Sequence, residues 1–440
     1  MIVKNQNLKL MFNEKKKYLV LVFFLYLSLL AGLFFEENLL HGAKTDYFSI
    51  SESLNIFESD VLYYFNNYKE IGLRHSPIFQ LIHIVFLKIF DNDIIFKLTI
   101  IHINLLILVF FYLCMRIKIK NNLLILASVL FIFPSFRSYS IWPDSFLFGF
   151  IFFITSIYFI LKFIESDDNK KIYYAYFNII SLAISSYVSP NFATFSIFYL
   201  YIFYKYLKFS SSLMKLIFLN FILVIPAFIY IFIMDNNFLD FDGSRWVKDL
   251  STLSLVNLAN KIIVLPTIFI IYFIPFLIVD FKLTKIFLNK QAKKLNYSHY
   301  LIILSPFLFL KYFSYDEISD ALGGAGLFYN LFKTFNFFEF LICIISSISI
   351  FIILLFTINN LKSSIFIICL ILSNPQLTIY TIYFDLILVT CIFLFFNNNI
   401  LKFEEMFKNR NNSIKFFLYY LFILSLYIFK QDYYTLIKNI

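Results

Sequence analysis

Apolar residues occur in long blocks along this chain of 440 residues, and these blocks constrain its fold more than any other feature. Hydrophobic residues make up 61% of the sequence and charged residues only 15%, which is more apolar surface than a water-soluble core can bury. A helix needs about 20 mostly apolar residues to cross the hydrocarbon layer of a membrane, and many blocks approach that length. The sequence therefore predicts an all-α protein, a polytopic bundle of transmembrane helices.

We expect about 11–13 of these blocks to cross the membrane. The candidate spans are residues 18–35, 94–114, 123–134, 146–163, 174–188, 192–207, 216–234, 262–279, 300–313, 340–358, 364–372, 377–396 and 416–429. No internal repeat, linker or soluble domain separates them, so residues 1–440 are expected to form a single transmembrane domain.

Lysine and arginine are concentrated in alternate connections between the blocks. If the N-terminus is cytoplasmic, the inner connections hold 24 of the 37 Lys and Arg residues, as the positive-inside rule requires. The net charge of +10 then reports topology and gives no reason to expect a nucleic-acid partner. We predict a multi-pass protein of a bacterial inner membrane with a cytoplasmic N-terminus. Its four cysteines all lie in apolar blocks, without disulfide or zinc spacing.

The longest polar passage, residues 36–93, follows the first span and is predicted to be the first outer loop. It carries a dense set of carboxylates, and we expect any chemistry of this protein to occur there. Residues 77–90 within it are too few for a comfortable crossing. They are predicted to form an interfacial or re-entrant helix, because counting them as a span would invert the charge asymmetry.

Four residues of this passage are candidates for a site. Asp46, in the sequence HGAKTDYF, is predicted to lie in a constrained turn above the membrane; it could equally cap a helix that begins near residue 50. Glu52 is the next acidic side chain. Arg74 and His75 precede Pro77 at the start of the interfacial helix, where an Arg and helix N–H groups suit a phosphate. A helix-starting Pro with solubilising neighbours is the alternative.

A second outer loop is predicted at residues 136–145, with the sequence FRSYSIWPDS. Arg137 and Asp144 are its candidate site residues. Asp144 directly precedes an apolar block, so it is either an active-site carboxylate or the N-cap of the next helix. Asp385 lies inside a later block, where a carboxylate is costly in hydrocarbon unless it faces a cavity or a partner, and it is a functional candidate on that ground.

The order of these features resembles the GT-C superfamily of membrane glycosyltransferases, which use polyprenyl-phosphate-linked sugars. The resemblance rests on one span followed by a large outer loop with an early acidic residue, on RHSPIFQL, on the R-x-x-x-x-x-P-D pattern from Arg137 to Asp144, and on the polar turn YVSPNF. It covers residues 18–205. The acidic pair of the family is replaced here by a lone Asp46, with Glu52 further along the chain.

The resemblance implies a glycosyltransferase that moves a sugar from a polyprenyl-phosphate-linked donor to a lipid, glycan or protein acceptor at the outer face of the membrane. Asp46 would be the catalytic base, and Asp144 would orient a cation or bind a metal. Glu52, Arg74, His75 and Arg137 would bind substrate. A divalent metal is compatible with this chemistry, although the sequence identifies no metal ligands.

Two other readings stay open. An O-antigen-type polysaccharide polymerase also has many spans and acts on lipid-linked sugars, but such polymerases favour Arg-rich outer loops, whereas the outer loops here are rich in carboxylates. A transporter or flippase for lipid-linked sugars would place ionisable residues near the membrane midplane. A central cavity lined by Asp385 would favour transport, and an outer cavity lined by Asp46 and Asp144 would favour transfer.

Overall fold

The computed structural model describes residues 2–40, 42–67, 76–90, 92–119, 121–166, 170–229, 255–315, 324–358, 360–374, 378–396 and 402–438. Within these ranges every regular element is a helix, and no strand occurs. The prediction of an all-α protein is therefore confirmed.

The helices are, in chain order, α1 (Ile2–Phe34), α2 (Gly42–Ser59), α3 (Val61–Asn66), α4 (Pro77–Phe90), α5 (Asp93–Lys118), α6 (Leu123–Ser128), η1 (Val129–Ile132), α7 (Pro134–Ile141), α8 (Ser145–Glu165), α9 (Lys171–Val188), η2 (Pro190–Thr194), α10 (Phe195–Leu207), α11 (Ser211–Phe228), α12 (Leu255–Ile278), α13 (Phe281–Ala292), α14 (Tyr297–Phe309), η4 (Leu310–Tyr312), α16 (Gly326–Phe332), α17 (Phe338–Thr357), α18 (Leu361–Leu372), η5 (Thr381–Tyr383), α19 (Asp385–Phe395), α20 (Phe403–Met406) and α21 (Arg410–Lys438).

Seven of the described helices are long and apolar enough to cross a membrane: α1, α5, α8, α11, α12, α17 and α21. The bent pair formed by α6–η1 and α7 makes an eighth if it is counted as one span. By the length and composition of its helices, the chain is an integral, multi-pass membrane protein.

The remaining predicted spans correspond to shorter or more polar helices. α10, α14, α18 and α19 have 11 to 13 residues each, fewer than the ~20 of an ordinary crossing. α9 has 18 residues but carries an asparagine and several serines. A short helix can lie in the interior of a bundle, where protein rather than lipid surrounds its ends, whereas α14 buries only Pro306 and is largely exposed. α19 fits this explanation, because each of its residues is buried.

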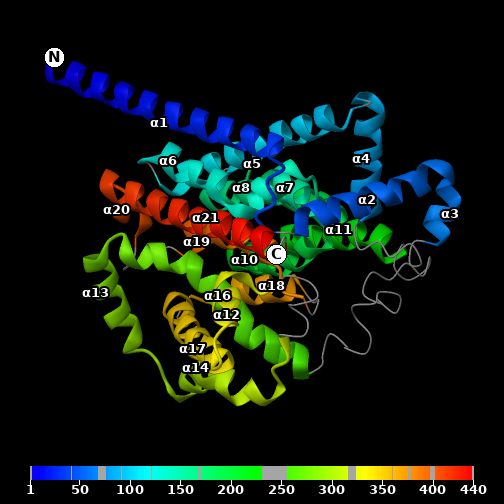
Figure 1. Ribbon diagram of the computed structural model, residues 1–440. Coiled ribbons are helices and arrows are strands. Elements are labelled where there is room, and N and C mark those ends of the chain that lie inside the picture. Colours follow the sequence, from blue (N-terminus) through cyan, green and yellow to red (C-terminus); the bar gives the residue numbers. More distant parts are fainter. Residues whose placement is uncertain are drawn as a thin grey trace.

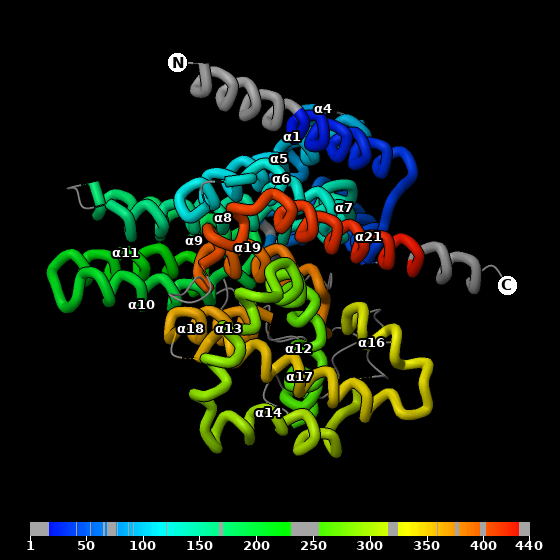
Figure 2. Tube along the Cα trace, turned by 90° about the vertical axis from the view of Figure 1, so that its left-hand side faces the viewer, coloured from blue at the N-terminus to red at the C-terminus, as the bar shows by residue number. Residues whose placement is uncertain are grey.

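The two ends of the bundle carry different connections (Figure 1). α2, α3 and α4 gather at one end, which we call the α2 face, while α13 and α20 lie at the opposite end, the α13 face. Both views place α1 and α5 above α21, and α12, α14 and α17 below it (Figures 1 and 2). The α2 face is the end that the charge pattern predicts to be outside.

The first polar passage folds into helices, as expected for its interfacial part. α4 occupies residues 77–90, the predicted range. The expectation for Asp46 is wrong, however, because α2 already begins at Gly42 and Asp46 lies within the helix rather than in a turn or at a cap. The helix forms early because Ala43, Tyr47, Ile50 and Leu54 make a buried stripe at helical spacing.

The prediction of a second outer loop at residues 136–145 is also wrong. Residues 134–141 form α7, which turns 62° from the preceding α6–η1 helix and is buried along its whole length. Pro134 explains the break, since a proline lacks the N–H of a continuing helix and Phe133 before it is held in an extended conformation. Only residues 142–144 connect α7 to α8.

Cysteine labelling tests the orientation of the two faces. The four native cysteines are buried and free, so they should react little. Ser49 in α2 and Asn289 in α13 are both exposed. In intact cells we expect a membrane-impermeant maleimide to label the Ser49→Cys variant at once and the Asn289→Cys variant only after permeabilisation. The reverse pattern would invert the predicted topology, and equal labelling would contradict a bundle with two separated faces.

Candidate functional site

A buried ion pair joins the end of α1 to α7. The Arg137 guanidinium donates through Nε and Nη2 to the two carboxylate oxygens of Glu37, both at 2.6 Å. It also donates to Oγ and to the carbonyl of Ser28, each at 3.0 Å. Arg137 is only 6% exposed. Its charge is thus already matched by a carboxylate. This arrangement indicates a residue that positions α7 rather than one that binds a phosphate.

Two further features belong to this junction. The Trp142 indole donates to the Glu37 carbonyl at 3.0 Å, which ties the end of α7 to the same residue. Gly32 of α1 lies so close that a Cβ there would stand 2.7 Å from Glu37 Oε2 and 3.3 Å from Arg137 Nη2. A side chain at position 32 would therefore push the ion pair apart.

Asp46 faces α7 from the second turn of α2. The Tyr139 hydroxyl donates to Asp46 Oδ2 at 3.4 Å, and the side chain of Asp46 is half-buried. Asp46, Asp144, Tyr380 and Tyr383 are the titratable groups that act electrostatically on the Tyr139 hydroxyl. The structure thus gathers both predicted catalytic carboxylates around one tyrosine, which the sequence analysis had not singled out.

Asp144 also has the second of its two expected roles. It is the N-cap of α8: its Oδ2 accepts from the Phe146 N–H at 2.9 Å, and its backbone is extended there. The residue is only 6% exposed. Capping uses one carboxylate oxygen, and Ser145 Oγ lies 3.4 Å from the other.

The other predicted substrate-binding residues are not brought to this place. Glu52 is exposed on α2. It follows Asp46 by six residues, and because that spacing turns a helix by about 240°, the two side chains point to different sides. Arg74 and His75 lie outside the described residues, so their phosphate-binding role stays a prediction.

A lysine at the start of α5 lies between two aromatic rings, one of them that of Tyr47, the residue after Asp46. The Lys97 ammonium sits 4.2 Å from the centroid of the Trp142 ring and 4.6 Å from that of Tyr47, and 2.8 Å from Asp93 Oδ2. The Tyr47 hydroxyl donates to Asp93 in turn. Burial and this carboxylate raise the pKa of Tyr47, so it stays a hydrogen-bond donor at neutral pH. The network ties α2 to α5 next to Asp46.

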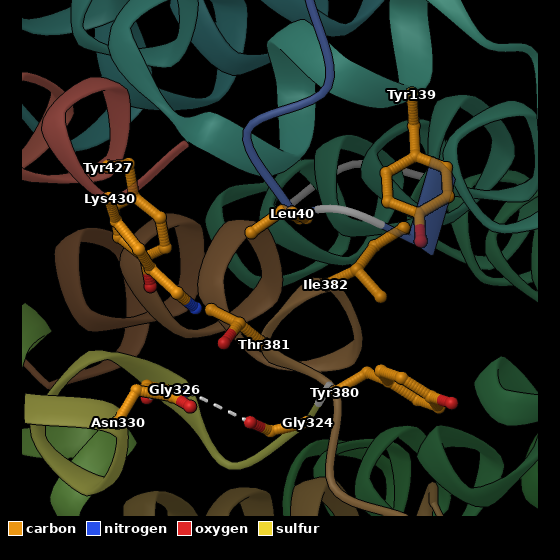
Figure 3. Close-up of a pocket in the computed structure, with 10 residues that line it drawn as sticks. All are labelled: Leu40, Tyr139, Gly324, Gly326, Asn330, Tyr380, Thr381, Ile382, Tyr427 and Lys430. Atoms are coloured by element: carbon orange, nitrogen blue, oxygen red, sulfur yellow. Dashed lines mark hydrogen bonds between the residues drawn. The ribbon is translucent and has the colours of Figure 1, made fainter. Parts of the chain in front are cut away.

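A small pocket opens beside Tyr139 (Figure 3). Its cavity volume is about 20 Å³, roughly the room that one water molecule needs. Five separate parts of the chain line it: Leu40, Tyr139 of α7, the segment with Gly324, Gly326 and Asn330, the segment with Tyr380, Thr381 and Ile382, and Tyr427 and Lys430 of α21. Figure 3 shows Tyr139 and Lys430 on opposite sides of it. Its lining mixes polar and apolar side chains and includes the cation Lys430, and its Tyr139 hydroxyl donates to Asp46.

The walls of the pocket are held by local hydrogen bonds. Asn330 Nδ2 donates to the carbonyls of Gly324 at 3.1 Å and Gly326 at 2.7 Å. Gly326 has φ +77°, and a Cβ there would stand 2.7 Å from Ile268 Cγ1, so only glycine fits. The ammonium of Lys333, just after α16, acts electrostatically on Lys430, which adds a second positive charge near the pocket.

The sequence analysis missed these pocket residues. Lys430 ends an apolar block, and Asn330 and Thr381 stand in no recognisable motif. They meet Tyr139 only through contacts between segments that are roughly 200 to 300 residues apart, for which a single sequence gives no signal.

Asp385 does not line this pocket. It is fully buried at the start of α19, where it accepts from the Leu386 N–H at 2.6 Å and from the Ser135 hydroxyl. The carboxyl group thus ties α19 to the beginning of α7. Among the described residues, no three His, Cys, Asp or Glu side chains lie close enough together to hold a metal ion.

Comparison of the chain with protein-family models, with curated proteins and with solved structures finds no match.

His83 of α4 packs behind this region. It is 1% exposed, its ring stacks 4.2 Å from that of Phe96, and neither ring nitrogen has a hydrogen-bond partner in the described part of the chain. Burial lowers the pKa of His83 to about 4; the Asp93 carboxylate opposes this shift and the Lys97 ammonium adds to it. The imidazole is neutral at pH 7.

This pKa predicts a loss of stability in acid. In the unfolded chain His83 binds a proton near pH 6.5, whereas in the folded protein it does so only near pH 4. The contribution of neutral His83 to the free energy of unfolding is therefore complete above pH 6.5 and falls as the pH drops toward 4. The loss reaches roughly 3 kcal/mol. The thermal midpoint of the detergent-solubilised protein, measured from pH 7.5 to 4, should fall more steeply for the wild type than for His83→Phe. Equal slopes would contradict the prediction.

Breaking the Arg137–Glu37 pair should be strongly destabilising. Arg137→Ala leaves the Glu37 carboxylate buried without its partner, which costs about 3–5 kcal/mol. The matched control is Lys402→Ala, because the Lys402–Glu405 pair is exposed and worth at most about 1 kcal/mol. Thermal midpoints of the two variants measure the difference. If Arg137→Ala has the same thermal midpoint as Lys402→Ala, the ion pair does not hold α1 and α7 together.

Proposed function

We propose that this protein is a membrane glycosyltransferase that moves a sugar from a polyprenyl-phosphate-linked donor to a lipid, glycan or protein acceptor. The proposal places the reaction at the α2 face, which the charge pattern predicts to lie outside a bacterial inner membrane. The observation that carries it is the pocket between Tyr139 and Lys430, together with the hydrogen bond from the Tyr139 hydroxyl to the Asp46 carboxylate.

The residue types suit such a transfer. An inverting transfer needs a carboxylate to take the proton of the acceptor hydroxyl as that oxygen attacks the anomeric carbon. In the proposal Asp46 is this base, since its side chain is half-buried and already accepts a hydrogen bond from Tyr139. Tyr139 would orient the carboxylate, and Asp144 would act mainly by fixing the start of α8 next to them.

The leaving group is a polyprenyl phosphate, whose developing negative charge needs nearby cations or N–H donors. Lys430 on the pocket wall and Lys333 near it are the candidates in the described residues. Arg137 takes a different part from the one the sequence suggested. Because Glu37 neutralises it, the proposal makes Arg137 the residue that holds α7, and with it Tyr139, in place.

The membrane setting supports a lipid-linked substrate. The pocket lies where the α2 face meets the apolar helices, and α21, which contributes Lys430 to it, is itself a candidate span. A donor could then keep its polyprenyl chain in the bilayer, while the pocket would widen to admit its phosphate and sugar. The transport alternative gains no support from Asp385, which is fully buried, hydrogen-bonded to Ser135 and not part of the pocket lining.

Removing the proposed base tests the function. In membranes given radiolabelled polyprenyl-phosphate sugars and native acceptors, Asp46→Asn should slow transfer by at least about a hundredfold. The control is Glu58→Gln, an exposed acidic residue near the end of the same helix, which should transfer at the wild-type rate.

Two results would count against this proposal in different ways. Wild-type rates from Asp46→Asn, at equal protein level, would remove Asp46 as the base. A wild-type protein that transfers no sugar from any polyprenyl-phosphate donor would contradict the glycosyltransferase itself.

A further inference from the structure

At the α13 face, Lys362 stands in the first turn of α18 with its side chain half-buried. Its ammonium lies 4.4 Å from the centroid of the Phe395 ring at the end of α19. The described residues offer it no ion pair and no hydrogen bond. The aromatic ring shields one side of the charge but cannot neutralise it.

Two more lysines stand on helices that neighbour this position. Lys118 at the end of α5 and Lys205 in the last turn of α10 both act electrostatically on Lys362. The helices concerned are neighbours: α18 packs against α10 and α19, and α19 packs against α5. One carboxylate is present, Glu165, at 3.0 Å from Lys118. The group therefore holds three ammonium ions and one carboxylate; Asp167 and Asp168 of the next connection lie outside the described residues.

Lysines at helix C-termini have an ordinary explanation, because the negative end of the helix dipole favours a cation there. This covers Lys118 and Lys205 but not Lys362, which stands at the positive end of α18. Its position combines an unfavourable dipole, two like charges and partial burial, each of which raises the free energy of the ammonium ion. An anion bound among the three lysines would offset all three effects.

We propose that Lys118, Lys205 and Lys362 bind the phosphate headgroup of an anionic membrane lipid. A lipid is favoured over a free phosphate because α18 presents an exposed apolar face directly beside the lysines. Leu361, Ile368 and Leu372 are between 54% and 60% exposed on this short helix. The acyl chains can lie along these side chains, while the headgroup stays with the lysines at the α13 face. This site is independent of the pocket at the α2 face.

Lipid titration of the delipidated full-length protein, read by native mass spectrometry, tests this site. The probes are phosphatidylglycerol, phosphatidylcholine and inorganic phosphate. We expect phosphatidylglycerol to bind more tightly than phosphatidylcholine. We expect Lys362→Gln to weaken the binding of phosphatidylglycerol about fivefold. The control is Lys290→Gln, an exposed lysine of α13 at the same face, which should bind like the wild type. Lys118→Gln is the second variant and should weaken binding to a similar degree.

Three outcomes would overturn the proposal. Phosphatidylglycerol binding that is equal in the wild type, Lys362→Gln and Lys118→Gln would remove these lysines from any lipid site. An equal loss in Lys290→Gln would show a diffuse effect of charge at this face. Displacement of phosphatidylglycerol by millimolar inorganic phosphate, with equal affinity for both, would assign the lysines to a free anion instead of a lipid.

Discussion

The ion pair between Arg137 and Glu37 is the contact on which the geometry of the candidate site depends. A charge this deeply buried needs a partner with good geometry, and the two parallel hydrogen bonds at 2.6 Å provide it. Glu37 lies three residues after the end of α1, so the pair fixes α7 against α1, and Gly32 leaves the space for it. Tyr139, two residues after Arg137, is then directed at Asp46. The proposed base, its tyrosine partner and one wall of the pocket follow from this single contact.

Polar groups are arranged by depth in this protein. Asp93 and Lys97 pair at the start of α5, and Asp46 on α2 contacts Tyr139 on the pocket wall. The carboxyl group of Asp385 is instead satisfied within the bundle by Ser135 and a backbone N–H. This division suits chemistry at a membrane surface, with the apolar helices holding a lipid tail. It also separates the pocket from Lys118, Lys205 and Lys362 at the α13 face, the proposed site for an anionic lipid.

Features that depend on local sequence patterns were predicted correctly from the sequence. Apolar blocks gave the helices, residues 77–90 gave α4, and the Asp144 position before an apolar block allowed the N-cap that is present. The sequence failed where tertiary contacts decide. The polar letters of FRSYSI suggested a loop, but Arg137 finds Glu37 a hundred residues earlier and α7 is buried. Asp46 was expected in a turn because the apolar stripe of α2 stabilises a helix only when neighbouring helices bury it, and the sequence alone does not show those neighbours. Lys430 gave no sign of the pocket, since its partners there lie far away in the chain.

The central claim is that the pocket between Tyr139 and Lys430 receives the phosphate and sugar of a polyprenyl-linked donor. A cryo-electron microscopy structure of the protein in lipid nanodiscs, with a polyprenyl-phosphate sugar added, tests this directly. The account predicts density for the headgroup in that pocket, with its sugar next to Asp46 and its phosphate next to Lys430. A donor bound at another place on the protein, with this pocket left unchanged, would contradict it.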